Sequence, residues 1–239
     1  MDKKYELSPG LKQRLEKKRK AHKRKMIIRG IISGVAAVVL VIVVLYHFHI
    51  IPHKYYNNAD FGIEEFQSSV DKDADGTDDQ TDILKGVRAY IATKPKYKSV
   101  YYATGYPNDE YGVCTDVVAQ GLLAAGYDLM ELVNEDILAN REDYDIEKPD
   151  KKIDFRRVRN LYVYFQNTAI SLTTDVLEIE EWQGGDIIVF KSHIGVVSDR
   201  RNAKGIPYVI HHGSPQQLGY EQDILLGRDD IIGHFRITE

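Results

Sequence analysis

An uninterrupted apolar stretch near the amino terminus constrains this chain more than any other feature of its sequence. Residues 30–51, GIISGVAAVVLVIVVLYHFHII, contain no Asp, Glu, Lys or Arg. At about 1.5 Å per residue, a helix of this length spans roughly 33 Å, enough to cross a bilayer core about 30 Å thick. Aromatic rings near its far end suit the membrane interface. The stretch therefore predicts a transmembrane helix.

The charges on either side of this stretch predict its orientation. Residues 1–29 carry twelve Lys or Arg and three Asp or Glu, out of chain totals of 32 basic and 36 acidic residues, which leaves 20 basic and 33 acidic residues beyond them. Basic residues stay on the cytoplasmic side of a membrane. We therefore expect a basic cytoplasmic tail over 1–29, a membrane span over 30–51 and an acidic extracellular domain. Such a chain is a single-pass protein of the cell membrane.

Two other interpretations of this region are weaker. A cleaved signal peptide usually has an apolar core of about 7–15 residues that ends in small residues, whereas this stretch is longer and ends in bulky ones. A basic arm that binds nucleic acid is unnecessary, because the adjacent span already accounts for the positive charge. We therefore expect a membrane anchor and no nucleic-acid partner.

The exported part of the chain changes character along its length. Residues 52–70 have no regular period and are predicted as a stalk. Amphipathic helical patterns dominate from Ile83 to about Thr168, and short β-branched segments separated by Gly, Pro and Asn follow. Helices first and strands later predict an α+β domain over 83–239, with a helical layer on a mainly antiparallel sheet.

An acidic segment precedes the first of these helices. DKDADGTDDQTD, residues 71–82, fits the spacing of a calcium-binding loop, with Gly76 at the sharp turn. The ligands would be Asp71, Asp73, Asp75, the carbonyl of Thr77, Asp79 and Asp82. The alternative is a solvated acidic linker in which Thr81 or Asp82 caps the helix at Ile83. The sequence therefore leaves a structural Ca²⁺ open.

The one cysteine, Cys114, lies in GVCTDVV at the predicted start of a helix that ends near Gly126. A single cysteine forms no internal disulfide, so an exported thiol is either a buried small hydrophobe or a reactive group. Exposed N–H groups at a helix start favour the thiolate and can hold a developing oxyanion. Gly112 would leave room for a substrate backbone. These features make Cys114 a candidate nucleophile.

Nucleophilic catalysis by a thiol also needs a base, and histidine is the usual one. His193 opens the predicted strand HIGVVSD, and His211 ends the predicted strand YVIHH. If the two strands pair through the loop between them, both histidines fall near the same end. Alternation along a strand allows only one of His211 and His212 to face His193. A zinc site from Cys114 and histidines is a weaker alternative, since no short metal-ligand spacing supports it.

The order of these segments resembles a known family. Three segments are similar to the motifs of NlpC-type cell-wall cysteine endopeptidases. They are GGDIIVFKSHIGVVSD, YVIHHGS, and YATGYP before GVCTDVV. The longer series from GVCTDVV to IIGHFR looks like a bacterial domain family of unknown function related to those amidases, over roughly residues 82–239. The sequence departs from the endopeptidase pattern by having Gly-Tyr for Gly-Gly and Val-Cys-Thr for Asp-Cys-Ser.

This resemblance implies a papain-like fold and a set of roles. Cys114 is the implied nucleophile, His193 the general base, His211 the residue that orients the imidazole, and Tyr102 the hydroxyl near the thiol. The implied reaction is hydrolysis of an amide in peptidoglycan stem peptides through an acyl-enzyme, with no cofactor required. A non-catalytic, wall-facing binding or scaffold module on the same fold is the alternative.

Two further features have structural and functional interpretations. Three arginines in DFRRVRN (154–160) either clamp a substrate carboxylate or pair with the acids of the domain, and we favour pairing. Trp182, just before GGD, is expected in the core or in a cleft wall.

Overall fold

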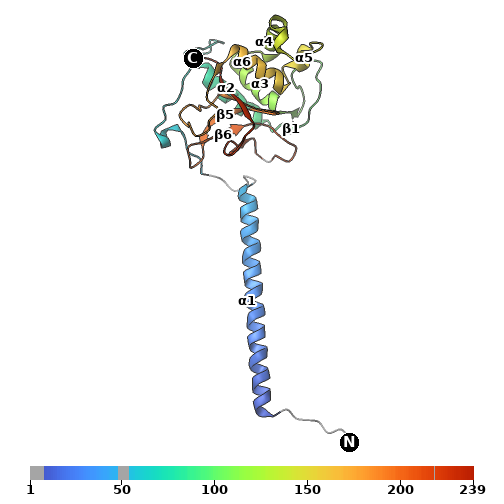
Figure 1. Cartoon of the computed structure of the whole chain (residues 1–239), viewed down its shortest axis with the longest axis vertical. Coiled ribbons are helices and arrows are strands. Elements are labelled where there is room, and N and C mark those ends of the chain that lie inside the picture. The colour runs from blue at the N-terminus through green and yellow to red at the C-terminus, as the bar shows by residue number, and fades with distance from the viewer. Residues whose placement is uncertain (1–7, 48–53, 218) are drawn as a thin grey trace. The chain divides into compact units, whose positions relative to one another are not determined.

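The computed structural model describes residues 8–47, 54–217 and 219–239 (Figure 1). The chain divides into two units, an amino-terminal one that runs to His53 and a second one, Lys54–Glu239, that holds all the strands and all but one of the helices described below. Each unit is considered by itself.

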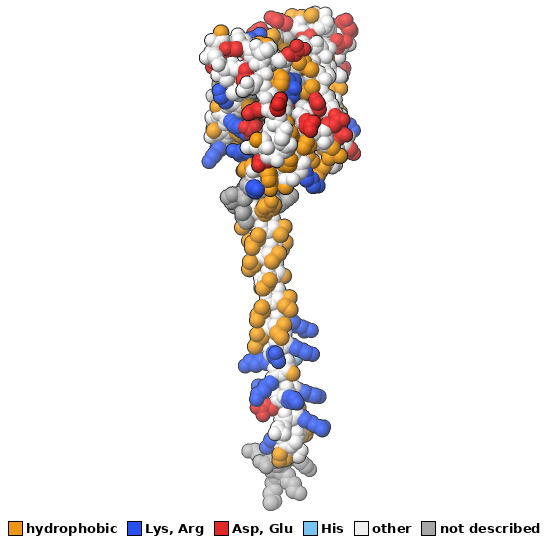
Figure 2. Space-filling view, turned by 90° about the vertical axis from the view of Figure 1, so that its left-hand side faces the viewer, with side chains coloured by type: hydrophobic (Ala, Val, Ile, Leu, Met, Phe, Trp, Pro, Cys, Tyr) orange, Lys and Arg blue, Asp and Glu red, His pale blue; other side chains and the backbone are white. Residues whose placement is uncertain are grey.

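The amino-terminal unit contains one long helix, α1 (Pro9–His47), of 39 residues. Figure 2 shows Lys and Arg side chains along its first part and a sleeve of apolar side chains along its second part. Its most apolar window has a mean hydropathy of 2.7 and is not buried within the protein, so the helix is long and apolar enough to cross a membrane. The predicted span is helical as far as His47, and its last residues, 48–51, lie outside the described part of the chain.

The prediction of a stalk over 52–70 is wrong for the residues that the structure describes. Residues 54–70 belong to the second unit and pack onto the rest of it, where Tyr56 forms a β-bridge with Arg201. Asn58 is buried in a short 3₁₀ helix, η1 (Asn58–Phe61), and donates to Gln183 Oε1 at 2.7 Å. At its far end the segment meets the last residue of the chain, where Ser69 N–H donates to Glu239 O at 2.7 Å. Polar side chains hid this packing, because they anchor the segment by hydrogen bonds rather than by a periodic apolar face.

Five α-helices and a second 3₁₀ helix form the helical layer of the second unit. Pro95 lies just beyond the first of them, and Asp128 caps the third, accepting from Met130 N at 3.0 Å. The first begins at Asp79 with Asp78 as its N-cap, four residues before the predicted start, and neither Thr81 nor Asp82 caps it. The elements are α2 (Asp79–Ala92), α3 (Cys114–Ala124), α4 (Leu129–Ala139), η2 (Arg141–Asp143), α5 (Lys151–Asp154) and α6 (Val158–Thr168).

A six-stranded sheet forms the second layer, and every neighbouring pair in it is antiparallel. Its order is β3-β8-β4-β5-β6-β7, and the loop at 202–206 joins β5 to β6 as a hairpin. The strands are β3 (Ile170–Ser171), β4 (Ile187–Phe190), β5 (His193–Arg201), β6 (Pro207–Ile210), β7 (Glu221–Gln222) and β8 (Ile231–Arg236). Two short parallel strands, β1 (Lys96–Tyr97) and β2 (Tyr111–Gly112), lie apart from this sheet.

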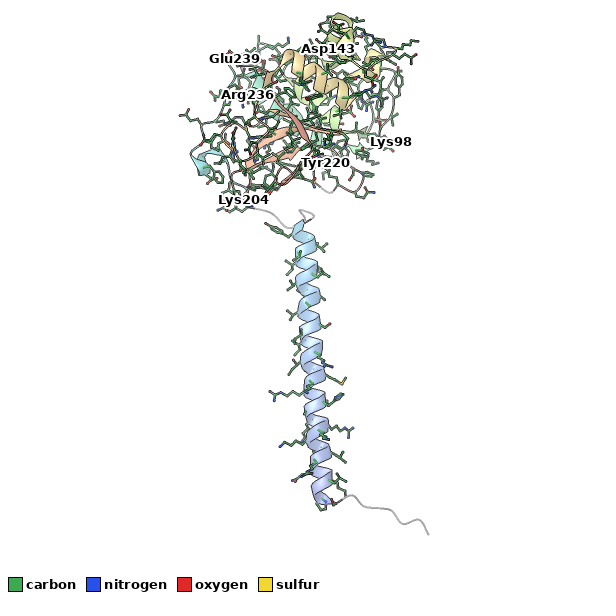
Figure 3. The ribbon with its side chains drawn as sticks, in the orientation of Figure 1. Lys98, Asp143, Lys204, Tyr220, Arg236 and Glu239 are labelled. Carbon is green, nitrogen blue, oxygen red and sulfur yellow. The ribbon has the colours of Figure 1, made fainter. Side chains whose placement is uncertain are left out.

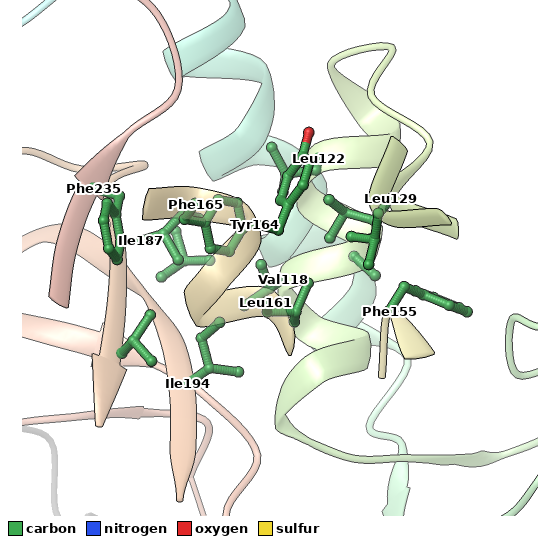
Figure 4. Close-up of a cluster of buried hydrophobic side chains, with 14 of the residues drawn as sticks. Val118, Leu122, Leu129, Phe155, Leu161, Tyr164, Phe165, Ile187, Ile194 and Phe235 are labelled. Atoms are coloured by element: carbon green, nitrogen blue, oxygen red, sulfur yellow. The ribbon is translucent and has the colours of Figure 1, made fainter. Parts of the chain in front are cut away.

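The larger hydrophobic core fills the space between the helices and this sheet. Figure 4 shows side chains of α3, α4 and α6 meeting those of β4, β5 and β8, among them Val118, Leu161, Ile194 and Phe235. Two glycines set the approach of α2 to α3, because a methyl group on Gly86 would overlap Ala124 and one on Gly121 would overlap Val87. The predicted α+β domain with a mainly antiparallel sheet is confirmed.

A second apolar cluster lies on the opposite face of the sheet, around Trp182. Trp182 is fully buried and stacks on His234 with ring centroids 3.8 Å apart, so it belongs to the core. His234 Nε2 lies 3.1 Å from the buried carboxylate of Asp186, which also accepts two hydrogen bonds of 2.8 Å from Arg236. This ionic cluster ties β8 to the start of β4 and thereby fixes the middle of the sheet.

Candidate active site

Cys114 occupies the first position of α3, as the sequence predicted. β2 delivers the chain to this point, and the extended backbone of Val113 forms the N-cap. The cap has no side-chain oxygen of its own, and instead Asp116 Oδ2 accepts from the Val113 N–H at 2.8 Å. The thiol is free and partly exposed. The first turn of α3 is therefore held by a carboxylate two residues beyond the thiol.

A buried ion pair fixes that carboxylate. Arg156 Nε donates to Asp116 Oδ1 at 2.7 Å and its Nη2 donates to Oδ2 at 2.9 Å, with side-chain exposures of 2% and 0%. Arg156 also donates to the carbonyl of Val100 at 2.5 Å. The favoured interpretation of this arginine, pairing with an acid of the domain, is confirmed. Arg156 therefore has a structural role, because it holds the first turn of α3 in place.

The environment of the thiol differs from the expected one. Burial raises the pKa of Cys114 to about 11, although the backbone N–H groups of Ile194 and Thr115 favour the thiolate. The prediction that the helix start lowers this pKa is therefore wrong in the resting structure, because desolvation outweighs the partial charge of the helix end. The Ile194 N–H also locates the sulfur against the start of β5, beside His193.

The predicted proximity of the two histidines is confirmed. His193 Nε2 lies 2.9 Å from His211 Nδ1, and the rings meet edge to face at 4.9 Å. Gly195, two residues along β5, makes this approach possible, because a methyl group there would crowd Val209 and His211. Burial lowers the pKa of His193 to about 4 and that of His211 to about 3. Both rings are therefore neutral near pH 7, and one donates to the other.

An aromatic and a charged side chain lie next to the His193 ring. Its plane stacks on Phe190, whose ring also carries the guanidinium of Arg228 at 4.2 Å from its centroid. Arg228 is paired with Asp230 through hydrogen bonds of 2.7 and 2.6 Å. No residue that the structure describes hydrogen-bonds to Nδ1 of His193, which leaves this nitrogen available to accept a proton.

His212 is also part of this region. Among the described residues His211, and not His212, forms the hydrogen bond with His193, as the predicted alternation requires, and the sheet ladder continues past β6 to His211. His212 is 3% exposed, and its ring lies against those of Tyr97 and Tyr220, the second of which is labelled in Figure 3. Burial lowers the pKa of His212, while the nearby Asp116 raises it.

Buried polar atoms without partners gather around the same place. Within the described residues, five buried side-chain nitrogen or oxygen atoms lack a hydrogen bond, and three of these belong to Tyr90, His211 and His212. Natural proteins satisfy most such atoms, and exceptions often mark catalytic groups or unseen water. The presence of three such unpaired atoms in this region supports a functional site here, independently of the cysteine.

Gly112 has a different role from the expected one. A methyl group on it would overlap the hydroxyl oxygen of Tyr90, so the space that a side chain would need is filled by Tyr90 and not by substrate. Burial raises the pKa of Tyr90 well above its usual range, and Asp116 raises it further. Sequence reasoning missed Tyr90, since it appeared only as one member of the apolar stripe of α2.

Tyr102 is buried but directed elsewhere. Its hydroxyl donates to Asp109 Oδ1 at 2.7 Å, and its ring lies under the guanidinium of Arg156. Burial and this hydrogen bond raise the pKa of Tyr102 to about 12. Within the described structure no hydrogen bond joins it to Cys114, so its predicted position at the thiol is not observed.

The acidic loop brings together three of its six predicted ligands. Asp71, Asp73 and Asp75 place carboxylate oxygens within 4.8 Å of one another, all exposed. The backbone curls around them, with Gly76 N–H donating to Asp71 Oδ2 at 2.9 Å and Gly76 at φ +95°. They are the only group of acidic, His or Cys side chains so arranged among the described residues. A zinc site from Cys114 and the histidines is thus not supported.

The remaining predicted ligands are arranged differently. Asp79 is buried in the first turn of α2, where it accepts from Lys72 N at 2.8 Å and from the hydroxyl of Tyr127 at 2.5 Å. Asp82 is also buried, and burial together with Asp75 and Asp73 raises its pKa. Thr77 contributes a backbone N–H to Asp75, at 2.8 Å. Three of the six predicted ligands therefore lie together, and Asp79 instead forms hydrogen bonds within the fold.

Comparison with known proteins identifies the family. A model of a domain of unknown function, DUF1287, matches residues 84–237, which is more than half of the chain. The chain belongs to the DUF1287 family. It is also similar to an uncharacterized protein, YijF, of Escherichia coli strain K12, with 35% identity over 168 residues that cover 64% of this chain and 80% of YijF. No solved structure matches significantly.

The DUF1287 region contains the whole candidate active site. Cys114, His193, His211 and Tyr102 all fall within it, and so do Tyr90 and Arg156. The acidic loop at 71–77 lies before the matched region. The site and the loop are therefore separable features of this chain.

Proposed function

We propose that this DUF1287 domain is a cysteine-dependent amidase or peptidase that cleaves amide bonds of cell-wall peptides. The observation that carries the proposal is the hydrogen-bonded pair His193–His211 at the start of β5, the strand whose Ile194 N–H favours the thiolate of Cys114. A nucleophile at a helix start, an imidazole base and a third group that orients the imidazole form the usual arrangement for acyl transfer by cysteine.

The chemistry divides among these groups as follows. The Cys114 thiol gives its proton to Nδ1 of His193 as its sulfur attacks the carbonyl carbon of the substrate amide. The C–N bond then breaks, the proton on His193 passes to the departing nitrogen, and a thioester remains on Cys114. Water, deprotonated by His193, attacks the thioester and releases the carboxylic acid and the thiol.

The pKa values at the site agree with a concerted first step. The thiol, with a pKa raised to about 11, and His193, with a pKa lowered to about 4, are both neutral at rest. No stable thiolate–imidazolium pair forms before substrate arrives, so the proton moves as the sulfur attacks. Oxyanion stabilisation comes from the N–H groups at the start of α3, which lie at the positive end of the helix.

The substrate class in this proposal follows from location. α1 is able to anchor the chain in a membrane, and its Lys and Arg residues favour a cytoplasmic amino terminus, which leaves the domain outside. A hydrolase held just outside the cell membrane faces the peptidoglycan and its stem peptides. The similarity of the GGD, HIG and IHH segments to NlpC-type endopeptidases supports both this substrate class and a papain-like fold.

The test compares full-length protein in detergent micelles with its Cys114→Ala variant on purified peptidoglycan. Mass spectrometry of the soluble fraction should show new stem-peptide fragments with wild type and none with the variant. His22→Ala, altered in the basic tail, serves as the matched control and retains activity. Equal product release by wild type and Cys114→Ala would refute the proposal, and wall binding by both without products would favour the binding module.

A further inference from the structure

His211 is held from two sides by glutamines of the following segment. Gln217 fixes the backbone, since its Nε2 donates to the carbonyl of His211 at 2.9 Å and its Oε1 accepts from Gly213 N–H at 2.5 Å. The second glutamine, Gln222, approaches the ring from β7. Neither was singled out in the sequence, because both belong to an irregular polar stretch.

The register of the sheet aligns Gln222 with His211. Val209 pairs with Gln222 across β6 and β7, and the ladder continues one step further, where His211 N–H donates to Tyr220 O at 2.8 Å. Val209 and the Cβ of His211 both border Gly195 on the same face of the sheet. Gln222 is therefore a diagonal neighbour of His211 on that face, within reach of its ring.

The free nitrogen of His211 needs such a neighbour. Nδ1 is occupied by His193, and Nε2 is buried without a hydrogen bond to any described residue, in a side chain that is 6% exposed. The Gln222 side chain, the diagonal neighbour on this face, raises the pKa of His211, which is the effect of a hydrogen-bond acceptor.

We propose that Gln222 is a positioning residue whose amide oxygen holds the Nε2 proton of His211 and so selects the tautomer of both histidines. With its proton on Nε2, neutral His211 has only an acceptor at Nδ1. The 2.9 Å contact then requires His193 to donate through Nε2. The remaining nitrogen of neutral His193, Nδ1, carries a lone pair and can accept the thiol proton.

The opposite orientation of the amide inactivates the base. If the amide NH₂ of Gln222 pointed at Nε2, the His211 proton would lie on Nδ1 and would be donated to His193 Nε2. The proton of neutral His193 would then lie on Nδ1, the nitrogen needed for the thiol. One side chain on β7 thus decides whether His193 is a base, a role that extends the proposed function by one residue.

Ring-nitrogen NMR of the full-length chain in micelles, with ¹⁵N labels confined to histidine, measures the tautomers directly. Wild type should show His211 and His193 both protonated at Nε2. Gln222→Glu offers an acceptor only and should keep this pattern, whereas Gln222→Leu should lose it. The exposed Gln166→Leu is the matched control and should change nothing. A wild-type His211 protonated at Nδ1, or an unchanged pattern in Gln222→Leu, overturns the proposal.

Kinetics on cell-wall peptide adds a second measurement that depends on the proposed function. Gln222→Leu should lower kcat by about 10-fold to 100-fold with little change in KM, and Gln222→Glu should restore most of the loss. A loss in Gln222→Leu confined to KM, or no loss at all, contradicts the positioning role. If wild type proves inactive on every wall substrate, the proposed function fails, while the NMR experiment still decides the role of Gln222.

Discussion

The carboxylate of Asp116 accepts from both Nε and Nη2 of Arg156 and from the backbone N–H of Val113, so one buried ion pair holds the residue just before the candidate nucleophile. The partners come from α3 and from the turn between α5 and α6. The position of the thiol therefore depends on an arginine that lies outside its own helix.

Arg156→Met should lower the free energy of unfolding by about 3–5 kcal/mol, because Asp116 would keep a buried charge without its partner. Urea denaturation measures the loss. Arg159→Met removes an exposed pair with Asp145 and should cost under about 1 kcal/mol. Similar losses in the two variants would contradict a structural role for the buried pair.

The rate of alkylation at Cys114 should follow its raised pKa. With iodoacetamide, the rate should rise about tenfold per pH unit and level off only near pH 11, because burial disfavours the thiolate. The urea-unfolded chain should level off near pH 8.5, the ordinary value for cysteine. A plateau near neutral pH in the folded protein would instead indicate a thiolate–imidazolium pair at rest.

The neutral histidines predict a loss of stability in weak acid. The folded-state pKa values of His193 and His211 lie below the unfolded value of about 6.5, so the unfolded chain binds protons first as the pH falls. Their contribution is fully present above pH 6.5 and is lost progressively toward pH 4 and below.

The variant His193→Gln separates the loss of stability caused by histidine protonation from the loss caused by carboxylate protonation. Between pH 6.5 and 4.5, the free energy of unfolding of wild type should fall by up to about 2 kcal/mol more than that of the variant. Parallel curves for the two proteins would show that His193 is not held neutral in the fold.

The contact between Gly112 and Tyr90 predicts a specific rescue. Gly112→Ala should destabilise the domain by about 1–3 kcal/mol, because its methyl group overlaps the Tyr90 hydroxyl. Tyr90→Phe removes that oxygen and should recover most of the loss in the double variant. The cost of Gly112→Ala would be unchanged by Tyr90→Phe if substrate, and not Tyr90, required the glycine.

The calcium interpretation of the acidic loop stays a prediction with a direct test. Isothermal titration of the full-length chain with Ca²⁺ should give heat that Asp73→Asn abolishes, since Asp73 belongs to the clustered trio. Asp143→Asn, outside the loop, is the control. No heat at millimolar Ca²⁺ would leave the solvated linker as the interpretation of residues 71–77.

Local signals in the sequence sufficed for much of this architecture. The helix start at Cys114, the cap at Asp128 and the strand that opens at His193 each follow from capping residues or β-branched runs, and all are observed. The pairing of His193 with His211 was predictable because a short hairpin loop joins their strands. These features depend on neighbours in the chain.

The features that the sequence did not predict depend on distant partners. The pKa of Cys114 is raised by burial against β5. The position of Cys114 at a helix start does not reveal this burial. Residues 54–70 resembled a stalk because Asn58 and its neighbours pack through hydrogen bonds with distant residues. Tyr90 matters because it lies against Gly112, and Gln222 matters because it neighbours His211. Each pair joins two different elements, and no spacing in the sequence connects its members.

Cys114 begins a helix of the first half of the domain, whereas His193 and His211 belong to a hairpin of the second half. Neither half contains both the nucleophile and its base. Contacts between positions so far apart in sequence form late in folding, after the costly closure of a long loop. An unfolded chain therefore carries a thiol without a base, and the candidate site assembles only when the helical and strand halves dock.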